Sequence, residues 1–171
     1  MCIRDRRSSR ARFLTGSNKI LAMFGFLLTT IALVAVTVAI HAYGTVYWIR
    51  FLVRRYANPD GDFTRDNALP ALIWTAVVLL MLHLIEVIVW ALAYMLILPG
   101  DQLAGFEKAM YFSVVTFATL GYGDITLADH QWRILSGIEA LNGVLLVGWT
   151  TALLFLVFQR CWKGLTQGHG E

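Results

Sequence analysis

The sequence predicts an all-α membrane protein with three transmembrane helices and a re-entrant segment between the second and the third. Hydrophobic residues make up 58% of the 171 residues, and the mean hydropathy is +0.64. This composition is too apolar for an ordinary soluble domain. Residues 20–49 contain no charged side chain, and residues 67–100 and 134–159 contain one each. Each stretch is long enough to cross the hydrocarbon core, which takes about 20 helical residues.

The first 19 residues are basic, and we expect them to form a separate N-terminal arm (residues 1–19). Their charge is +5, from six basic residues against Asp5, so the rest of the chain carries −2 of the total +3. This distribution excludes a nucleic-acid-binding surface. The segment is a cytoplasmic arm, a targeting-like region or a non-native extension ahead of a start at Met23. Cys2 and Cys161 are too few for a disulfide framework or a thiolate metal site.

Three helices and a loop follow along the chain. The first helix is expected over residues 20–43, with an extension to residue 56 in which Arg50, Arg54 and Arg55 mark the membrane exit. Residues 57–69 form a loop, because they contain the run Asn-Pro-Asp-Gly-Asp. The second helix covers residues 70–98 and begins at Pro70, a good first-turn residue. The third helix covers residues 132–160 and leaves a tail over residues 163–171; Trp132 and Trp162 are spaced as interfacial anchors.

Between the last two helices lies an unusual segment, Thr119-Leu120-Gly121-Tyr122-Gly123-Asp124. Non-helical backbone at membrane depth persists only where it is buried in protein or lines a wet cavity. Glycine reaches positive φ without steric cost, so Gly121 and Gly123 allow successive carbonyl groups to face one side. Four such segments around an axis would stack rings of carbonyl oxygens that replace the water around a potassium ion.

The segment resembles the pore loop of potassium channels, whose pattern is Thr-x-x-Thr-x-Gly-Tyr-Gly-Asp. The matching residues are Thr116, Thr119, Gly121, Tyr122, Gly123 and Asp124. The outline of the chain is similar to small bacterial three-helix potassium channels, and the resemblance covers residues 70–158 of the expected pore domain, residues 70–162.

The resemblance implies a pore helix over residues 106–118 and a selectivity filter over residues 119–124. K⁺ would bind the carbonyl oxygens of Thr119, Leu120, Gly121 and Tyr122, with Gly123 at the outer mouth. Asp124, Tyr111 and Thr116 would support the filter, Tyr111 by a hydrogen bond to Asp124. The resemblance also implies a homotetramer in the lipid bilayer of a plasma membrane, a bacterial inner membrane. It implies K⁺ as permeant ion, no cofactor, no catalytic residue and no nucleic-acid partner.

Two residues depart from the usual potassium channel string. Ala118 replaces a common Thr, and Leu120 replaces the usual Val or Ile. Both side chains pack behind the filter, so we expect selectivity to be retained, while the stability and inactivation of the filter are open. Phe112 and Val115 stand where relatives place polar groups behind the filter.

On the third helix, the ungapped match places Gly143 at the hinge position of the simple channels. Close helix packing is the alternative role for Gly143, and it is the expected role for Gly148. The same match implies a cavity wall and an inner constriction built from Val144, Val147, Thr151 and Phe155.

Polar residues within the second and third helices form a further candidate site. His83 and Glu86 lie on one helical stripe, and an intramembrane carboxylate is costly. Glu86 either hydrogen-bonds Asn142 or shares a proton with His83. The cluster of His83, Glu86 and Asn142 is therefore a modulator of gating by pH or a packing contact behind the pore. Glu139 acts near the filter mouth or bonds to the second helix.

Other functions are weighed against a selective channel. A membrane metalloenzyme needs clustered ligands on facing helices, whereas the four histidines are scattered along the sequence (His41, His83, His130 and His169). A non-selective cation channel and a non-conducting structural subunit are the alternatives; Tyr122 between two glycines favours selectivity. The stimulus for gating is not indicated. A filter facing outside requires the first helix to begin outside, yet six basic residues precede this helix and four follow it, which favours the reverse.

Overall fold

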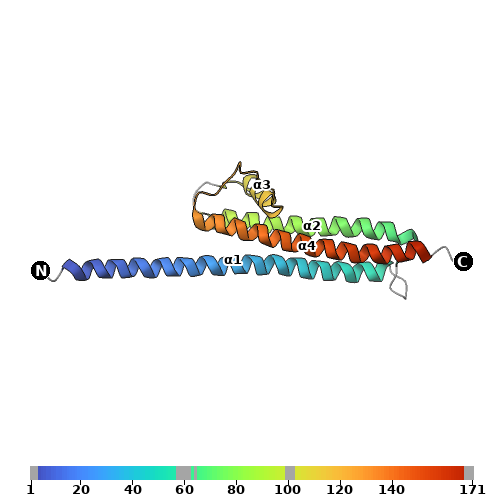
Figure 1. Cartoon of the computed structure of the whole chain (residues 1–171), viewed down its shortest axis with the longest axis horizontal. Helices are drawn as coiled ribbons and strands as arrows, with labels where there is room; N and C mark the ends of the chain where they lie inside the picture. Colours follow the sequence, from blue (N-terminus) through green and yellow to red (C-terminus); the bar gives the residue numbers. More distant parts are fainter. Residues whose placement is uncertain (1–3, 57–62, 64, 99–102, 168–171) are drawn as a thin grey trace.

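The computed structural model describes residues 4–56, 63, 65–98 and 103–167. The described chain folds into α1 (Arg4–Tyr56), α2 (Arg65–Ile97), α3 (Phe106–Phe117) and α4 (His130–Gln167). Figure 1 shows α1, α2 and α4 running side by side, with the short α3 against one end of α2 and α4. The N-terminal part of α1 extends past the ends of the other helices (Figure 1).

Three of these helices are long and apolar enough to cross a membrane. The qualifying segments are Met23–Tyr56, Asp66–Ile97 and His130–Lys163. Large apolar side chains are exposed along them, such as Leu28 of α1 and Leu96 of α2. Such exposure is unfavourable in water but suits contact with lipid tails. The three expected apolar helices are therefore present, and they are compatible with a membrane protein.

The helix ends differ from the sequence expectations at several places. α1 begins at Arg4 rather than near residue 20, so residues 4–19 continue the first helix, and the separate arm stays a prediction. This segment contains no proline and many good helix formers. α2 begins at Arg65 rather than Pro70, with Asp66 in its first turn, where the helix dipole favours a carboxylate. The loop expected over residues 57–69 is correspondingly shorter, and residues 57–62 and 64 lie outside the described residues.

The other two helices agree more closely with expectation. α3 ends at Phe117 with Ala118 as its C-cap, one residue before the expected end of the pore helix. α4 begins two residues before Trp132 and continues to Gln167, so part of the tail expected over residues 163–171 is helical. Residues 168–171 lie outside the described residues.

The buried core lies around α2, which packs against each of the other three helices. Trp90 and Tyr94 of α2 and Leu146 of α4 are fully buried, and Phe112 of α3 is buried beside them. A second cluster at the opposite end joins Leu52 of α1 to Val157 and Cys161 of α4, with Ala68 and Ala71 of α2. Trp90 and Tyr94 thus lie on the face of α2 that enters the core.

α1 presents a buried polar stripe to the other helices. The stripe consists of Thr30, Thr37, His41 and Thr45, which are spaced by seven, four and four residues. Each threonine hydroxyl bonds to a carbonyl of its own helix, for example Thr45 to His41 O at 2.8 Å. At Gly44 the approach of α1 to α2 is so close that a Cβ would lie 2.5 Å from the side chain of Leu82. α1 therefore docks on the other helices along one face.

Gly143 lies where α4 crosses the end of α3. A Cβ on Gly143 would lie 2.1 Å from the carbonyl oxygen of Phe117, whereas a Cβ on Gly148 would meet no atom within 4 Å. α4 is continuous through both positions. Close packing, the alternative weighed for Gly143, is therefore present in the structure, and the hinge role stays a prediction. Among the described residues, no atom lies close enough to Gly148 to supply the packing expected there.

We predict that Gly143→Ala lowers the stability of the protein, because the added methyl group overlaps the backbone of Phe117. Overpacking of this kind costs about 1–3 kcal/mol. The measurement is the midpoint of thermal unfolding in detergent, with Gly25→Ala as control because a Cβ there meets no atom within 4 Å. An unchanged midpoint with impaired channel opening would instead support the hinge.

Candidate ion-conduction site

The predicted filter, residues 119–124, follows directly from the C-terminal end of α3. The amide of Ala118 bonds to Val114 O at 3.0 Å, and that of Thr119 bonds to Thr116 O at 2.9 Å. The next two amides, of Leu120 and Gly121, both bond to Val115 O, at 2.9 and 3.4 Å. The carbonyl groups in the last turn of α3 are thus occupied by the start of the filter segment, which fixes its direction.

The backbone of the filter segment alternates in the sign of φ. Thr119, Gly121 and Gly123 have φ of 57°, 55° and 79°, whereas Leu120 and Tyr122 are not among the residues with positive φ. In a regular strand, successive carbonyl groups point to opposite sides. When successive residues alternate between positive and negative φ, every second peptide plane turns over, and the carbonyl groups then face the same side. This is the backbone arrangement that the two glycines predict.

Thr119 is the unexpected member of this alternation. A β-branched residue at positive φ is a conformational outlier, and the left-handed region costs about 1–2 kcal/mol for a residue with a Cβ. The hydrogen bonds that tie Thr119 and Leu120 to α3 hold the residue in this conformation. The sequence did not indicate the positive φ of Thr119, because among residue types only glycine predicts this conformation.

The filter segment lies exposed on the surface of the single chain. All residues from Ala118 to Asp124 are exposed, including the side chains of Leu120 and Tyr122. A cavity of about 620 Å³ separates the segment from α4. Its lining includes Thr119, Gly121 and Gly123 on one side and Ser136, Gly137 and Ala140 of α4 on the other. The segment is therefore not packed against the last helix of its own chain.

The outer end of the filter segment is held by one side-chain contact. The hydroxyl of Tyr111 donates to Asp124 Oδ2 at 2.7 Å, as the sequence analysis expected. This hydrogen bond raises the pKa of the Tyr111 hydroxyl above its ordinary value of 10. The proton therefore stays on Tyr111 at neutral pH, and the contact is lost only as the pH rises through this raised pKa. Arg133 Nε bonds to Leu127 O at 2.6 Å and ties the following residues to α4.

The predicted cavity residues share one exposed face of α4. Val144, Val147, Thr151 and Phe155 are spaced by three, four and four residues, and all are exposed in the single chain. Such a face can contact a neighbouring chain or line a pore. The expected place of these residues at the cavity wall and the constriction is compatible with it and stays a prediction. Thr116 is half-buried beside the cavity at the filter segment.

Glu139 lies behind the filter segment in a fully buried cluster. The hydroxyl of Tyr94 donates to Glu139 Oε2 at 2.7 Å, and the other carboxyl oxygen contacts Ser113 Oγ of α3. Ser113 Oγ also lies 3.2 Å from Val87 O. Ser113 has one proton, so both of its contacts are hydrogen bonds only when it donates to Val87 and Glu139 is protonated. The hydrogen bond to the second helix, weighed for Glu139, is present.

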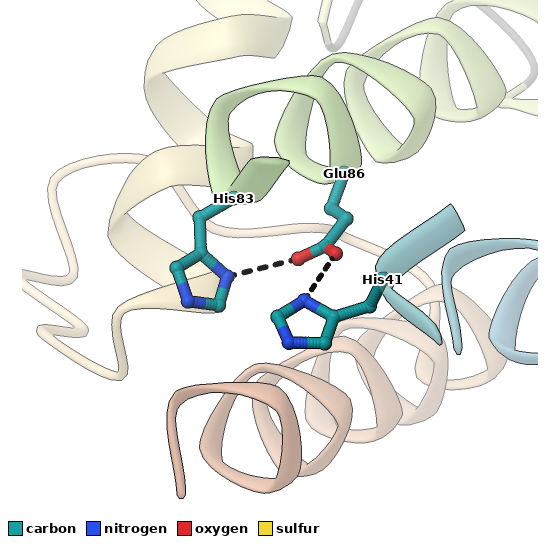
Figure 2. A group of neighbouring side chains, drawn as sticks. All are labelled: His41, His83 and Glu86. Carbon is teal, nitrogen blue, oxygen red and sulfur yellow. Dashed lines mark hydrogen bonds and ion pairs between the residues drawn. The ribbon is translucent and has the colours of Figure 1, made fainter. Parts of the chain in front are cut away.

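Glu86 contacts one of its two expected partners, His83, but not the other, Asn142. Its carboxylate contacts His83 Nδ1 at 2.9 Å and His41 Nδ1 at 2.8 Å, as Figure 2 shows. Asn142 instead donates to Thr37 Oγ1 of α1 at 2.9 Å, so the expected bond between Glu86 and Asn142 is wrong. Depth along the helices was the basis for that pairing, and depth does not tell which face of α4 meets α2.

The histidines are also less scattered than their positions in the sequence suggested. His41 joins His83 and Glu86, and the possible ligand atoms of the three lie within 4.8 Å of one another. The spacing of Thr37, His41 and Thr45 along α1 was the available sign that His41 faces the other helices. Each imidazole Nδ1 is already paired with a carboxylate oxygen, however, and Nε2 of each ring faces the hydroxyl of Thr150.

Known proteins give the family of this site. Residues 80–160 match the family model described as "Ion channel". A 76-residue stretch is 36% identical to two-pore potassium channel 4 of Arabidopsis thaliana, covering 42% of this chain and 26% of the relative. A 97-residue stretch is 28% identical to TWiK family of potassium channels protein 18 of Caenorhabditis elegans, covering 57% of this chain and 20% of the relative. No solved structure matches.

The described fold and these matches support a multi-pass membrane protein of the ion channel class, and they point to a transport role. More particularly, the family match and the potassium channel relatives support its membership of the potassium channel pore-domain family. The matched part spans only about a quarter or less of the length of these relatives.

We predict that Tyr111→Phe weakens the outer end of the filter segment, because Asp124 loses its hydrogen-bond partner. Potassium current through the variant should decline several-fold faster at constant voltage than current through the parent protein. Tyr43→Phe is the matched control, since Tyr43 is an exposed tyrosine of α1. Equal rates of decline in the two variants would show that the contact does not stabilise the filter.

We predict that Glu139→Gln is tolerated, because glutamine copies the protonated acid: its amide donates to Ser113 and its oxygen accepts from Tyr94. The free energy of unfolding should change by less than about 1 kcal/mol. Glu139→Ala leaves two buried hydroxyl groups without their partner and should cost about 3 kcal/mol. Thermal unfolding of both variants in detergent measures the difference. A Gln variant as unstable as the Ala variant would mean that Glu139 is ionised.

Proposed function

We propose that this chain is a subunit of a potassium-selective channel that conducts K⁺ passively through a pore built by four copies. The observation that carries the proposal is the alternation of φ at Thr119, Gly121 and Gly123 within the Thr-x-Gly-Tyr-Gly segment. Carbonyl groups facing one side can replace the hydration shell of an ion when several chains surround it. The ion-binding oxygens would be the carbonyls of Thr119, Leu120, Gly121 and Tyr122.

Assembly of four copies is proposed from what the single chain leaves open. The filter segment is exposed, and its irregular backbone cannot face lipid, because lipid offers no hydrogen-bond partner. Each chain contributes one such segment, so four chains complete the rings of oxygens. The cavity between the segment and α4, and the exposed face with Val144 and Phe155, supply surfaces for the neighbouring copies and the pore. The proposed location is the plasma membrane, a bacterial inner membrane.

A non-selective cation channel is the alternative, and a non-conducting subunit is the next. The ungapped Gly121-Tyr122-Gly123 run and its regular alternation of φ favour selectivity, since a loosened filter would not need the left-handed Thr119. The names of the relatives, which are potassium channels, also support potassium as the permeant ion.

We predict that Gly121→Ala abolishes potassium selectivity. A Cβ at position 121 meets no atom within 4 Å, so its cost arises from the φ of 55° rather than from a clash. Gly105→Ala is the matched control: its φ is 93°, but it lies at the start of α3, away from the ion path. The measurement is the reversal potential in planar bilayers under opposed K⁺ and Na⁺ gradients.

The parent protein and Gly105→Ala should reverse near the potassium potential, and Gly121→Ala should reverse near zero or conduct nothing. Reversal of the parent protein near zero would favour a non-selective channel. Absence of current in the parent protein, in membranes where cross-linking shows four copies, would favour a structural subunit. A different number of copies would contradict the proposed assembly.

A further inference from the structure

Four side chains from three helices form a closed ring of contacts beside the proposed pore. Glu86 contacts His41 Nδ1 of α1 at 2.8 Å and His83 Nδ1 of α2 at 2.9 Å (Figure 2). On the far side of both imidazoles, Thr150 Oγ1 of α4 lies 2.9 Å from His83 Nε2 and 3.4 Å from His41 Nε2. The side chains of His41 and Glu86 are fully buried, and that of His83 is 14% exposed.

Counting protons shows that this ring is incomplete with both histidines neutral. It has four contacts, and each needs one proton between its two atoms. Two neutral imidazoles donate one proton each to Glu86, and Thr150 donates one to a single Nε2. The remaining contact then sets the Thr150 oxygen against the lone pair of the other Nε2. A fourth proton converts one imidazole to imidazolium and completes all four hydrogen bonds.

The net charge of the ring also favours the uptake of one proton. With Glu86 ionised and both histidines neutral, the ring carries −1 within an apolar helix bundle, where an uncompensated charge is costly. One added proton makes the ring neutral. The aromatic rings beside it, Trp149 of α4 and Phe117 of α3, supply no titratable group. The other buried carboxyl group of the described helices, Glu139, is bonded to Tyr94 and Ser113 instead.

We propose that His41, His83, Glu86 and Thr150 form an intramembrane binding site for one exchangeable proton, which joins α1 to α2 and α4. The site takes up this proton as a unit, since the imidazolium is stabilised by the carboxylate on one side and by the Thr150 oxygen on the other. Loss of the proton returns a net charge to the ring and breaks the contact between Thr150 and one histidine.

A proton fits the geometry better than a metal ion does. Each Nδ1 faces a different oxygen of Glu86 at ordinary hydrogen-bond distance, so each nitrogen–oxygen pair is spaced to hold one proton between its two atoms. A divalent metal on the same three groups would leave the site with a charge of +1. It would also lack a fourth protein ligand, because Thr150 lies on the opposite edge of both imidazoles.

The site has a short route to the proposed filter. The ring of His83 lies 5.8 Å from that of Phe117, the last residue of α3 and two residues before Thr119. An effect of the proton on current would rest on the proposed channel function. The proton site itself does not, so the experiment below is independent of conduction.

The test is a pH titration of ¹⁵N-histidine-labelled protein in bilayers, followed by the nitrogen chemical shifts of the imidazoles. His130 and His169 are replaced by glutamine, so that the two remaining imidazoles belong to the ring. We expect the pair to take up one proton in total between pH 8 and pH 5, rather than one proton each near the ordinary histidine pKa of about 6.5.

Two variants with matched controls complete the test. Glu86→Gln removes the charge that holds the proton and should abolish the uptake in this pH range, whereas Glu139→Gln should leave it unchanged. Thr150→Val removes one hydrogen bond to the imidazolium and should lower the midpoint by roughly one pH unit. Thr45→Val is its control, because that hydroxyl bonds only to carbonyls of α1.

Three results would overturn the proposal. The first is independent uptake of two protons by the histidines, and the second is a titration that Glu86→Gln does not change. The third is stoichiometric zinc in protein purified without chelator, because zinc would occupy the nitrogen atoms assigned to the proton. A protein that shows the expected titration but carries no K⁺ current would count against the proposed function alone.

Discussion

A polypeptide within a bilayer has no water to bond with, so each buried polar group needs a partner inside the protein. Much of this structure follows from that constraint. The amides at the start of the filter segment bond to the end of α3, and Glu139 is enclosed by Tyr94 and Ser113. Glu86 is enclosed by two histidines from different helices. These polar contacts determine how the helices align, because apolar packing against lipid-like neighbours would allow many alignments.

The same constraint explains how much of the fold was predictable. Stretches of membrane length with at most one charged residue predicted three long helices, and the glycines at 121 and 123 predicted the reversed backbone between the second and the third. Charge and hydropathy describe depth, but they say little about which face of one helix meets another. For that reason one of the two partners weighed for Glu86, Asn142, was wrong, and His41 was not placed beside Glu86. Contacts between residues far apart in the sequence are what composition cannot supply.

Single residues in this chain also serve purposes that their type does not reveal. A glycine within a membrane helix is compatible with bending and with close packing, and at Gly143 the carbonyl group of Phe117 occupies the space that a side chain would need. Thr119 is the opposite case: a residue poorly suited to positive φ adopts it because two neighbouring amides are bonded to α3. Local conformation at both positions is decided by the neighbouring helix rather than by intrinsic preference.

The two ends of the filter segment are anchored very differently. Three consecutive amides, from Thr119 to Gly121, hold its inner end to α3, whereas one hydrogen bond between exposed side chains, Tyr111 to Asp124, holds its outer end. The segment is therefore stiff where Thr119 joins α3 and more easily displaced at its other end, the tip at Gly123 and Asp124. Gly123 and Asp124 are then the residues of the segment that we expect to move most. In the proposed pore, an ion that enters past Asp124 would meet the more weakly held oxygens first and the more firmly held ones last.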